Sequence, residues 1–587
     1  MKILFVPYRF GRRLSGGAEL YHIQLVKNLL RSGHDVDVLT TTAGGFELKT
    51  RFGVLWREEF PPSDDSEDLG EGLSCRVIRR PVRNPSLPSL WLACRHLQKR
   101  FEAEQLIFQP RDFLPVERPV AFTGWHFPEV HGSQVWRWSG DKASILLPPG
   151  ARCLHLGGLA PRRRTMTIST GGGVVHRADV QGQFYVKSEL PADTRCEVLW
   201  LETPVGWWPA KDVRTLGLFI NSLAADTAEG TLTADLWEDY RQIVSRHYMI
   251  ETPIGSEQPD GWVEHRRRIA TARPSRFCTL FDKSRGPHSP SLDRWLRANA
   301  HRYDLIIAAN FPFSPPSIVF HRREKLRRPL ALLPLMHLDD EFYYWKHYLD
   351  FLSTADVVLT ISRYSEGVFS AWGARARFIG VGIEPDMLAP ADAGQRAAFR
   401  SRAGLAPDEP FMLTVCRKTP TKNYQSVIRA VERLQSESPV RLVFIGPEED
   451  GTSIDYSFII RLEGLDRQLL KAAYAEASAF ALMSENESFG MVFLEAWSQG
   501  TPVVGSAWCR PVAALISQVN GGFLARDAED LSRHLAWFLT HREEGKALGL
   551  RGQQAIFQEW TSDAMTARLN SALQSICSHS EAGSQPV

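Results

Sequence analysis

Apolar runs of strand length alternate with helical patterns in the first forty residues. The run KILFVPY (2–8) is continuous, as in a strand that is buried on both faces of a parallel sheet. Residues 18–30 then place apolar side chains at helical spacing, and DVDVLTT (35–41) has the pattern of a second strand. The pattern predicts a strand–helix–strand unit whose first connection, FGRRLSGGAE (10–19), is rich in glycine.

Two further series of strand and helix patterns follow later in the chain. Apolar runs such as YDLIIAANFP (303–312) end in loops, and ADVVLTIS (355–362) leads into a helix. A polar stretch around 389–409 precedes a new series that starts at Phe411. We therefore expect an α/β protein with two Rossmann-like domains that face a cleft, with the ligand loops at the carboxyl ends of the strands.

The middle of the chain has a different pattern. From about 109 to 225, short alternating runs are broken by Gly and Pro, which is typical of an antiparallel β-sandwich. We interpret it as an all-β domain inserted into the N-terminal α/β domain. The polar C-terminal end has the composition of a flexible tail. The predicted domains are 1–108 and 226–388 (N-terminal Rossmann-like domain, in two parts), 109–225 (inserted β-sandwich), 389–575 (C-terminal Rossmann-like domain) and 576–587 (flexible tail).

Composition and charge exclude several classes of protein. The formal net charge is only +2, so we expect no nucleic-acid partner. No apolar run reaches the roughly 18–20 residues of a membrane span. The cysteines form no C-x-x-C pair, which gives neither a zinc signature nor a disulfide framework and fits a cytoplasmic protein. Basic clusters at 162–164 and 321–328 could contact anionic lipid on the cytoplasmic membrane face, and solvated helix ends are the alternative.

The first candidate for chemistry is the stretch VCRKTPTKNY (415–424), which follows an apolar strand. It places two cations, Arg417 and Lys422, five positions apart in one loop. Such a pair suits a diphosphate, because Arg can bind two oxygens and Lys acts as a point charge. A solvated basic loop is the alternative.

The second candidate is SENESFGMVFLEAWSQGTPVV (484–504). We interpret it as a strand end, a loop with Glu487, a glycine turn at Gly490 and a helix from Met491 onward. Backbone N–H groups at a helix start can cradle a phosphate, and Glu495, one turn inside the helix, could reach ribose hydroxyls. A favourable charge near the helix start is the alternative role of Glu487, and a structural hydrogen bond is that of Glu495.

The motifs together resemble glycosyltransferase family 4. The resemblance rests on E-x7-E (Glu487 and Glu495), on the following A-x-x-x-G-x-P-V-V, and on R-x4-K at Arg417 and Lys422. SGGAE (15–19) and GGFLAR (521–526) are also similar to segments of that family. The resemblance implies a GT-B fold and a retaining, generally metal-independent transferase that uses a nucleotide-diphosphate-sugar as donor and has no cofactor.

The resemblance also assigns roles to residues. Cations at the donor diphosphate, carboxylates at the ribose and sugar, and a flexible glycine loop across the cleft would form the site, and Cys416 departs from the family's usual glycine before the arginine. His337, in PLMHLDD, matches the family's histidine near the reacting sugar, and a loop histidine without a role is the alternative. The implied catalytic residues are His337 and Glu487, and the implied donor-binding residues are Gly16, Gly17, Arg417, Lys422, Glu487, Phe489, Gly490, Met491 and Glu495.

We therefore expect a glycosyltransferase that moves a sugar to a glycan or lipid-linked glycan during bacterial surface-polysaccharide assembly. One alternative is a glycan-binding or scaffold protein with a degenerate transferase core, against which the four charged motif residues argue. A phosphorylase of the same fold is another, and it would need a pyridoxal-phosphate lysine motif that we do not find.

Overall fold

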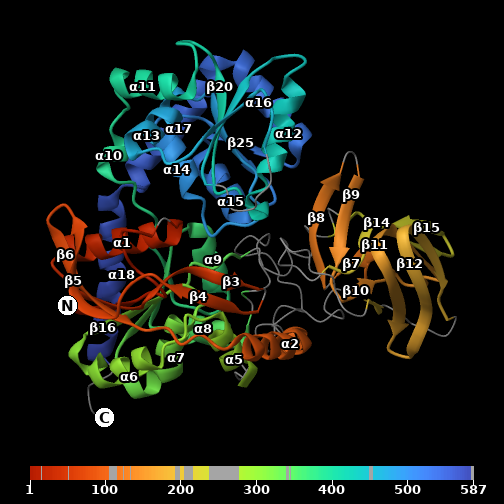
Figure 1. Cartoon of the computed structure of the whole chain (residues 1–587), viewed down its shortest axis with the longest axis horizontal. Coiled ribbons are helices and arrows are strands. Elements are labelled where there is room, and N and C mark those ends of the chain that lie inside the picture. Colours follow the sequence, from red (N-terminus) through yellow and green to blue (C-terminus); the bar gives the residue numbers. More distant parts are fainter. Residues whose placement is uncertain are drawn as a thin grey trace. The chain divides into compact units, whose positions relative to one another are not determined.

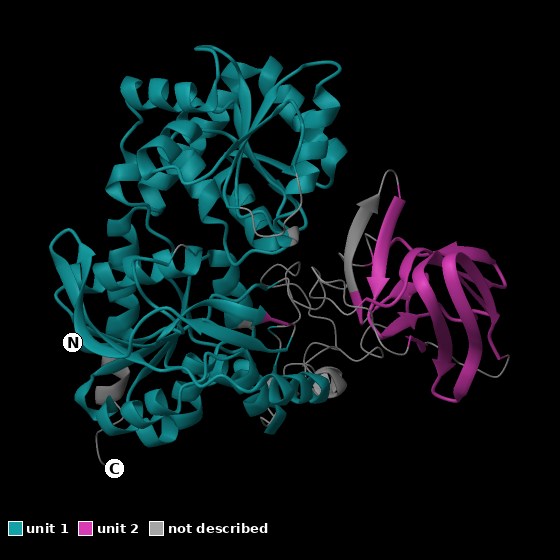
Figure 2. Ribbon diagram, in the orientation of Figure 1, with its two compact units in different colours: residues 1–48, 52–105, 269–587 teal, residues 49–51, 106–268 magenta. Residues whose placement is uncertain are grey.

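The chain divides into two compact units. The computed structural model describes residues 1–14, 16–50, 52–104, 115–122, 124–131, 134–191, 198–203, 216–236, 239, 276–338, 343, 345–447 and 454–582. Unit 1 comprises residues 1–48, 52–105 and 269–587, and unit 2 comprises 49–51 and 106–268 (Figure 2). Unit 1 therefore contains both α/β regions, and unit 2 contains the inserted region.

The N-terminal α/β domain of unit 1 is built on an eight-stranded sheet (Figure 1). All neighbouring strands are parallel except β5 and β6, which pair antiparallel. The predicted first strand is confirmed as β1, and the predicted DVDVLTT strand as β2, which pairs with it in parallel. In spatial order the strands are β19 (Ala376–Phe378), β18 (Val357–Thr360), β17 (Leu330–Leu333), β16 (Leu305–Ala309), β1 (Lys2–Val6), β2 (Asp35–Thr41), β6 (Leu73–Arg80) and β5 (Ser63–Gly70).

Helices follow most of these parallel strands, whereas β2 and β6 are connected through the strands β3, β4 and β5. The glycine-rich loop after β1 leads into α1, whose buried side includes Leu25, Val26 and Leu29. A separate two-stranded sheet is formed by β3 (Ala43–Lys49) and β4 (Val54–Glu58). The helices of this domain are α1 (Gly17–Arg31), α2 (Leu87–Glu104), α5 (Arg276–Arg285), α6 (Pro290–Asn299), α7 (Ser314–Leu326), α8 (Lys346–Thr354) and α9 (Arg363–Ala371).

The C-terminal α/β domain has a six-stranded, fully parallel sheet. Its spatial order is β22 (Ile459–Leu462), β21 (Arg441–Ile445), β20 (Phe411–Val415), β23 (Ala479–Leu482), β24 (Val503–Ser506) and β25 (Gly522–Ala525). The order reverses between β20 and β23, as in a doubly wound nucleotide-binding sheet. Its helices are α10 (Pro385–Leu388), α11 (Ala393–Ala403), α12 (Tyr424–Leu434), α13 (Arg467–Glu476), α14 (Met491–Ser498), α15 (Arg510–Val519), α16 (Ala528–Thr540) and α17 (Arg542–Glu559).

The last helix, α18 (Ser562–Ala582), returns to the N-terminal domain. Asn28 on α1 donates to the sulfur of Met565 at 3.5 Å, and Asn570 donates to Ser32 at 3.0 Å. The predicted boundary at 575 is therefore wrong in assigning this segment to the C-terminal domain. The predicted flexible tail 576–587 is also wrong for residues 576–582, which continue the helix, and residues 583–587 lie outside the described part of the chain.

Unit 2 is all-β, and its described strands pair antiparallel. The long strand β11 pairs with β12, β13 and β14 and so joins the strands into one nine-stranded sheet, which has its own hydrophobic core. The predicted end of the insertion at 225 is wrong, because β14 crosses that position and β15 pairs with it. The two layers of a β-sandwich stay a prediction. The strands are β7 (Val120–Ala121), β8 (Trp125–His131), β9 (Gln134–Ser139), β10 (Lys142–Leu146), β11 (Cys153–Thr170), β12 (Gly173–Glu189), β13 (Val198–Glu202), β14 (Phe219–Thr227) and β15 (Gly230–Thr233).

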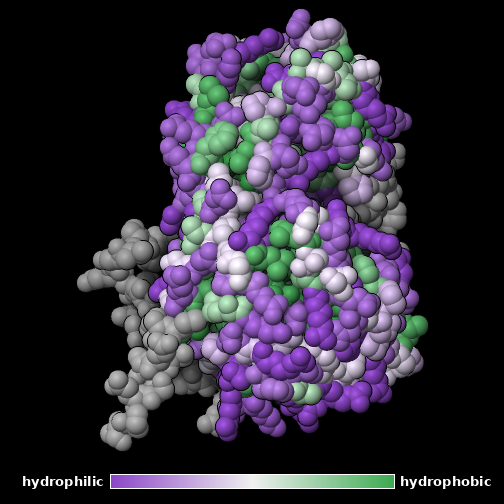
Figure 3. All heavy atoms as spheres, turned by 90° about the vertical axis from the view of Figure 1, so that its left-hand side faces the viewer, coloured by the Kyte–Doolittle hydropathy of each residue, from purple (hydrophilic) through white to green (hydrophobic). Residues whose placement is uncertain are grey.

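On the face drawn in Figure 3, hydrophilic residues predominate among the described ones and hydrophobic residues gather in small groups. None of the described helices is long and apolar enough to cross a membrane.

Two doubly wound sheets joined by a returning C-terminal helix confirm the predicted two-domain α/β architecture.

Candidate functional site

The reversal of strand order in the C-terminal domain brings two predicted loops together. The loop after β20 carries Arg417 and Lys422, and the loop after β23 carries Glu487. In open α/β sheets, ligands bind beyond the carboxyl ends of the strands at such a reversal. The residues that the sequence grouped by motif therefore lie where this sheet would hold a ligand.

Lys422 and Glu487 form an ion pair between these loops. The Lys422 Nζ donates to Glu487 Oε1 at 2.5 Å, and the side chains are only 18% and 10% exposed. The hydroxyl of Ser484 donates to the same oxygen at 2.9 Å. Burial on its own would raise the pKa of Glu487, but the charge and hydrogen bond of Lys422, the nearby His337 and the Ser484 hydroxyl hold it below its usual value. Glu487 is therefore a carboxylate at neutral pH.

The backbone of the loop after β20 is fixed by a glycine that the sequence analysis did not single out. Arg417 is exposed, and Cys416 before it is buried, with its N–H donating to Ile445 O at 3.0 Å. A Cβ on Gly446, whose φ is +145°, would lie 1.9 Å from the Cys416 carbonyl oxygen. The close approach therefore depends on Gly446, and a cysteine is tolerated at 416.

The predicted glycine turn and helix start occur at Gly490 and Met491. Gly490 is the N-cap residue of α14 with φ +95° and ψ 62°, a left-handed conformation that favours glycine. The neighbouring Phe489 is buried, and its ring centroid lies 5.1 Å from that of Trp560. The first N–H groups of α14 lack acceptors within the helix and carry partial positive charge. They begin close in sequence to the Glu487 carboxylate.

Glu495 lies one turn inside α14 and is half-buried. The hydroxyl of Tyr474, on α13, donates to Glu495 Oε2 at 2.9 Å. Burial raises the pKa of Glu495, although Tyr474 and the charge of Arg467 oppose this shift. Tyr474 thus orients the carboxylate through one oxygen, and the sequence analysis missed this residue.

The glycine loop of the N-terminal domain is tied to a buried carboxylate. Gly16 is the N-cap residue of α1, and Gly17 is exposed. A Cβ on Gly16 would lie 1.8 Å from Glu19 Oε2, so glycine leaves room for that carboxylate. Glu19 accepts from the hydroxyl of Tyr8 and from Arg9 Nε, the latter at 2.6 Å. The SGGAE motif contained Glu19, but nothing in the sequence placed Tyr8 and Arg9 beside it.

His337 provides a contact between the two α/β domains. It follows β17 of the N-terminal domain, and its Nδ1 lies 2.8 Å from Oδ1 of Asn486, in the C-terminal loop after β23. Its ring is stacked against Tyr343 with centroids 5.6 Å apart. Because an amide oxygen can only accept, the His337 Nδ1 carries the proton of this hydrogen bond. Asn486 is buried and directly precedes Glu487.

The structure thus brings three predicted residues together, namely His337, Lys422 and Glu487. Arg417 lies on the same loop as Lys422, and Phe489, Gly490, Met491 and Glu495 follow along α14 and its approach. Gly16 and Gly17 belong to the start of α1, and no hydrogen bond joins them to this cluster in the described part of the chain. Ser484, Asn486 and Tyr474 complete the cluster and were not predicted.

The C-terminal part of the chain is similar to known glycosyltransferases. Residues 395–555 match the family described as "Glycosyl transferases group 1". D-inositol 3-phosphate glycosyltransferase of Xylanimonas cellulosilytica is 31% identical over 193 residues, which cover 29% of this chain and 45% of that protein. A GDP-mannose-dependent monoacylated alpha-(1-6)-phosphatidylinositol monomannoside mannosyltransferase of Corynebacterium glutamicum is 26% identical over 243 residues, which cover 38% of this chain and 62% of that protein. The chain spans less than two thirds of the length of both relatives.

Among solved structures, the Anabaena protein Alr3699/HepE in complex with UDP and glucose is 18% identical, with a TM-score of 0.42, over 49% of this chain and 82% of that one. TarM is 10% identical, with a TM-score of 0.46, over 98% of each chain. The matched family segment contains Arg417, Lys422, Glu487 and Glu495. The chain is therefore similar to the glycosyl transferases group 1 family over residues 395–555, within its C-terminal α/β domain.

Proposed function

We propose that this chain is a retaining glycosyltransferase that moves a sugar from a nucleotide-diphosphate-sugar to a glycan or lipid-linked glycan. The observation that carries the proposal is the largely buried ion pair of Lys422 and Glu487 at the point where the strand order reverses. Its position suits a ligand that has both phosphate and hydroxyl groups.

The donor diphosphate binds between the loop after β20 and the start of α14. Arg417 is exposed and takes two phosphate oxygens, and the N–H groups at the start of α14 take others. Lys422 shares its ammonium between Glu487 and the diphosphate. These fixed positive groups stabilise the charge that develops on the leaving diphosphate, which supports metal-independent chemistry.

The two glutamates act on different parts of the donor. Glu495 is held by Tyr474 through Oε2, so Oε1 accepts a ribose hydroxyl. Glu487 of the C-terminal domain and His337 of the N-terminal domain lie where the two domains meet, and there the sugar meets the acceptor. Departure of the diphosphate leaves an oxocarbenium-like sugar, and attack from the same face retains the anomeric configuration.

The proposed acceptor follows from the name of one relative. The Corynebacterium glutamicum relative is named for a lipid-linked mannoside acceptor, which fits our expectation of surface-glycan assembly in the cytoplasm. Contact with a membrane stays a prediction. Arg322 and Arg323 of the basic cluster 321–328 are already paired, with Asp293 at 3.0 Å and Asp350 at 3.3 Å, which supports the alternative of solvated helix ends.

The test is a thermal-shift screen of the full chain against nucleotides and nucleotide sugars, followed by donor hydrolysis. Ligand binding to the folded state raises its stability by mass action, so the donor should stand out. Glu495→Ala should mainly weaken nucleotide binding, and Glu487→Ala should mainly lower turnover. The reverse pattern would overturn the assignment of roles.

A matched control is available in the same domain. Arg400 and Glu476 form an ion pair at 2.5 Å with side chains 14% and 15% exposed, away from the carboxyl end of β20. Glu476→Gln should leave the donor response unchanged. If no nucleotide sugar stabilises the protein and Arg417→Ala has no effect on hydrolysis, the chain is a glycan-binding or scaffold protein and the proposal fails.

A further inference from the structure

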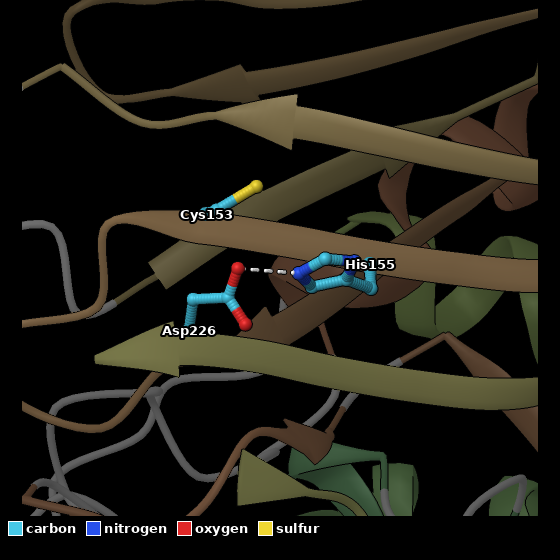
Figure 4. Close-up of side chains that lie close together, drawn as sticks. All are labelled: Cys153, His155 and Asp226. Atoms are coloured by element: carbon cyan, nitrogen blue, oxygen red, sulfur yellow. Dashed lines mark hydrogen bonds and ion pairs between the residues drawn. The ribbon is translucent and has the colours of Figure 1, made fainter. Parts of the chain in front are cut away.

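The sheet of unit 2 gathers three side chains that are all metal ligands in other proteins. Cys153 and His155 are two residues apart on β11, so they lie on the same face of the sheet. Asp226 lies opposite Cys153 on β14. One ligand atom from each lies within 4.8 Å of the other two (Figure 4). We propose that these residues bind a zinc ion, with the fourth position open to solvent.

The ligand set favours zinc over the common hard cations. A thiolate, an imidazole and a carboxylate combine sulfur, nitrogen and oxygen, and Zn²⁺ accepts all three in tetrahedral sites. Three protein ligands with one open position is the arrangement of accessible zinc sites. Cys153 is buried, whereas the side chains of His155 and Asp226 are 12% and 31% exposed, so the cluster opens to solvent on the carboxylate side.

The atoms that face away from the cluster are already held. His155 Nδ1 lies 2.5 Å from the hydroxyl of Tyr185, which leaves Nε2 for the ion. Asp226 Oδ1 accepts from Thr231 Oγ1 at 2.7 Å, which leaves Oδ2. Zinc ligands typically have such outer partners, which fix the ring and the carboxylate in the binding orientation.

A bound cation would have to replace the contacts that the ligand atoms already make. His155 Nε2 and Asp226 Oδ2 lie 2.8 Å apart and share a hydrogen bond that the ion would replace. Lys187 Nζ lies 3.8 Å from Asp226 Oδ2, but the Lys187 side chain is 57% exposed and can swing away. Glu189 lies opposite Cys153 on β12 and adds negative charge. With the Cys153 thiolate formed, the negative charges of Cys153, Asp226 and Glu189 exceed the positive charge of the Lys187 ammonium.

The sequence pattern could not reveal this site. Cys153 and His155 are two residues apart, but Asp226 is 71 residues beyond His155. Only the register of β11 with β14 brings it to the cluster, so no cysteine–histidine spacing marks it. The site lies in unit 2, outside the group 1 segment, and is independent of the proposed transfer reaction.

The test uses the full chain, freed of metal with a chelator, and Co²⁺ as a spectroscopic substitute for Zn²⁺. We expect one equivalent of Co²⁺ to bind, a near-ultraviolet band from thiolate to metal, and its loss when Zn²⁺ is added. Cys153→Ala should abolish the band. Asp226→Asn should weaken binding at least tenfold, and Tyr185→Phe by about 10–100-fold.

Three further variants make the outcome decisive. Lys187→Met removes the competing ammonium and should tighten binding, which a purely structural cluster would not do. Two control variants should change nothing. Cys75→Ala removes a cysteine of unit 1 that is as buried as Cys153, at 5% exposure. Asp179→Asn removes an aspartate of unit 2 that, like Asp226, has a threonine and a basic partner, here Thr165 and Arg163. If Co²⁺ gives no thiolate band, or if Cys153→Ala retains it, the proposal is wrong. If Cys153→Ala does not fold, Tyr185→Phe and Lys187→Met decide.

Discussion

Glu487 and Lys422 satisfy each other's charge in a largely buried setting. Glu487→Gln removes the carboxylate and leaves the ammonium without its partner, which we expect to cost about 3 kcal/mol of the free energy of unfolding at neutral pH. Urea unfolding followed by tryptophan fluorescence would measure this loss. Glu476→Gln, in the matched pair, should cost the protein stability without changing its response to the donor.

Glu487→Gln should also change how the free energy of unfolding depends on pH. The pKa of Glu487 is lower in the folded protein, so its contribution is complete above its ordinary value of 4.5 and is lost as the pH falls through the lowered folded value. The stability difference between wild type and Glu487→Gln should therefore be constant near neutral pH and shrink in acid. A difference that grows in acid would contradict the lowered pKa.

Asn486 positions His337 from the opposite domain. Its amide oxygen accepts the Nδ1 proton and so presents the His337 Nε2 as an acceptor. We expect Asn486→Ala to lower kcat about tenfold, the equivalent of one hydrogen bond, with the donor KM changed less than twofold. Steady-state kinetics with the donor identified by thermal shift would measure both constants.

The control for this variant is Asn299→Ala, which removes an asparagine that bonds to the Trp295 carbonyl in the N-terminal domain. It should leave both constants unchanged. A rise in KM without a fall in kcat for Asn486→Ala would mean that the residue binds substrate and does not position His337.

At the scale of elements, the turn before α14 depends on one backbone conformation. Gly490→Ala places a Cβ at φ +95°, 2.9 Å from the Phe493 ring, and should cost about 1–2 kcal/mol of stability and weaken donor binding. Chemical denaturation and the donor thermal shift measure the two effects. Gly367→Ala, inside α9 where a Cβ meets nothing within 4 Å, should instead stabilise by about 0.5–1 kcal/mol.

Local patterns predicted the elements that depend on neighbouring residues. The continuous apolar run of β1, the helical spacing of α1 and the sequence around Gly490 each contain their own physical signal, namely burial on both faces, amphipathic periodicity and a left-handed glycine. The loop residues of the candidate site were found because they follow such strands. The sequence could therefore place Lys422 and Glu487 at strand ends, although it did not show their direct pairing.

Contacts between distant segments could not be predicted in the same way. The hydrogen bond of His337 with Asn486 spans 149 residues. Tyr474, which donates a hydrogen bond to Glu495 on α14, lies on another helix, α13. The end of the insertion was misplaced because the alternating pattern of β14 and β15 does not mark where the insertion ends and the next helical region begins. Such features depend on strand order and register, which one sequence does not contain.

At the scale of the whole molecule, α18 ties the end of the chain to its beginning. The Arg568 guanidinium donates to the carbonyls of Ile379 and Glu559, and Leu569 is fully buried in the same helix. A segment that follows the C-terminal domain therefore stabilises the N-terminal one, which makes the two domains of unit 1 interdependent.

This interdependence gives the last prediction. Leu569→Ala should create a cavity that costs about 3 kcal/mol and should increase hydrogen exchange in α1 as well as in α18. Leu550→Ala, on the neighbouring α17 and 49% exposed, should change the free energy of unfolding by less than about 0.5 kcal/mol. Denaturant unfolding with hydrogen-exchange mass spectrometry would resolve both effects. If Leu569→Ala loosened only the C-terminal helices, α18 would be a passive tail. If α1 loosens with it, the glycine loop at Gly16 and Gly17 depends for its rigidity on the last helix of the chain.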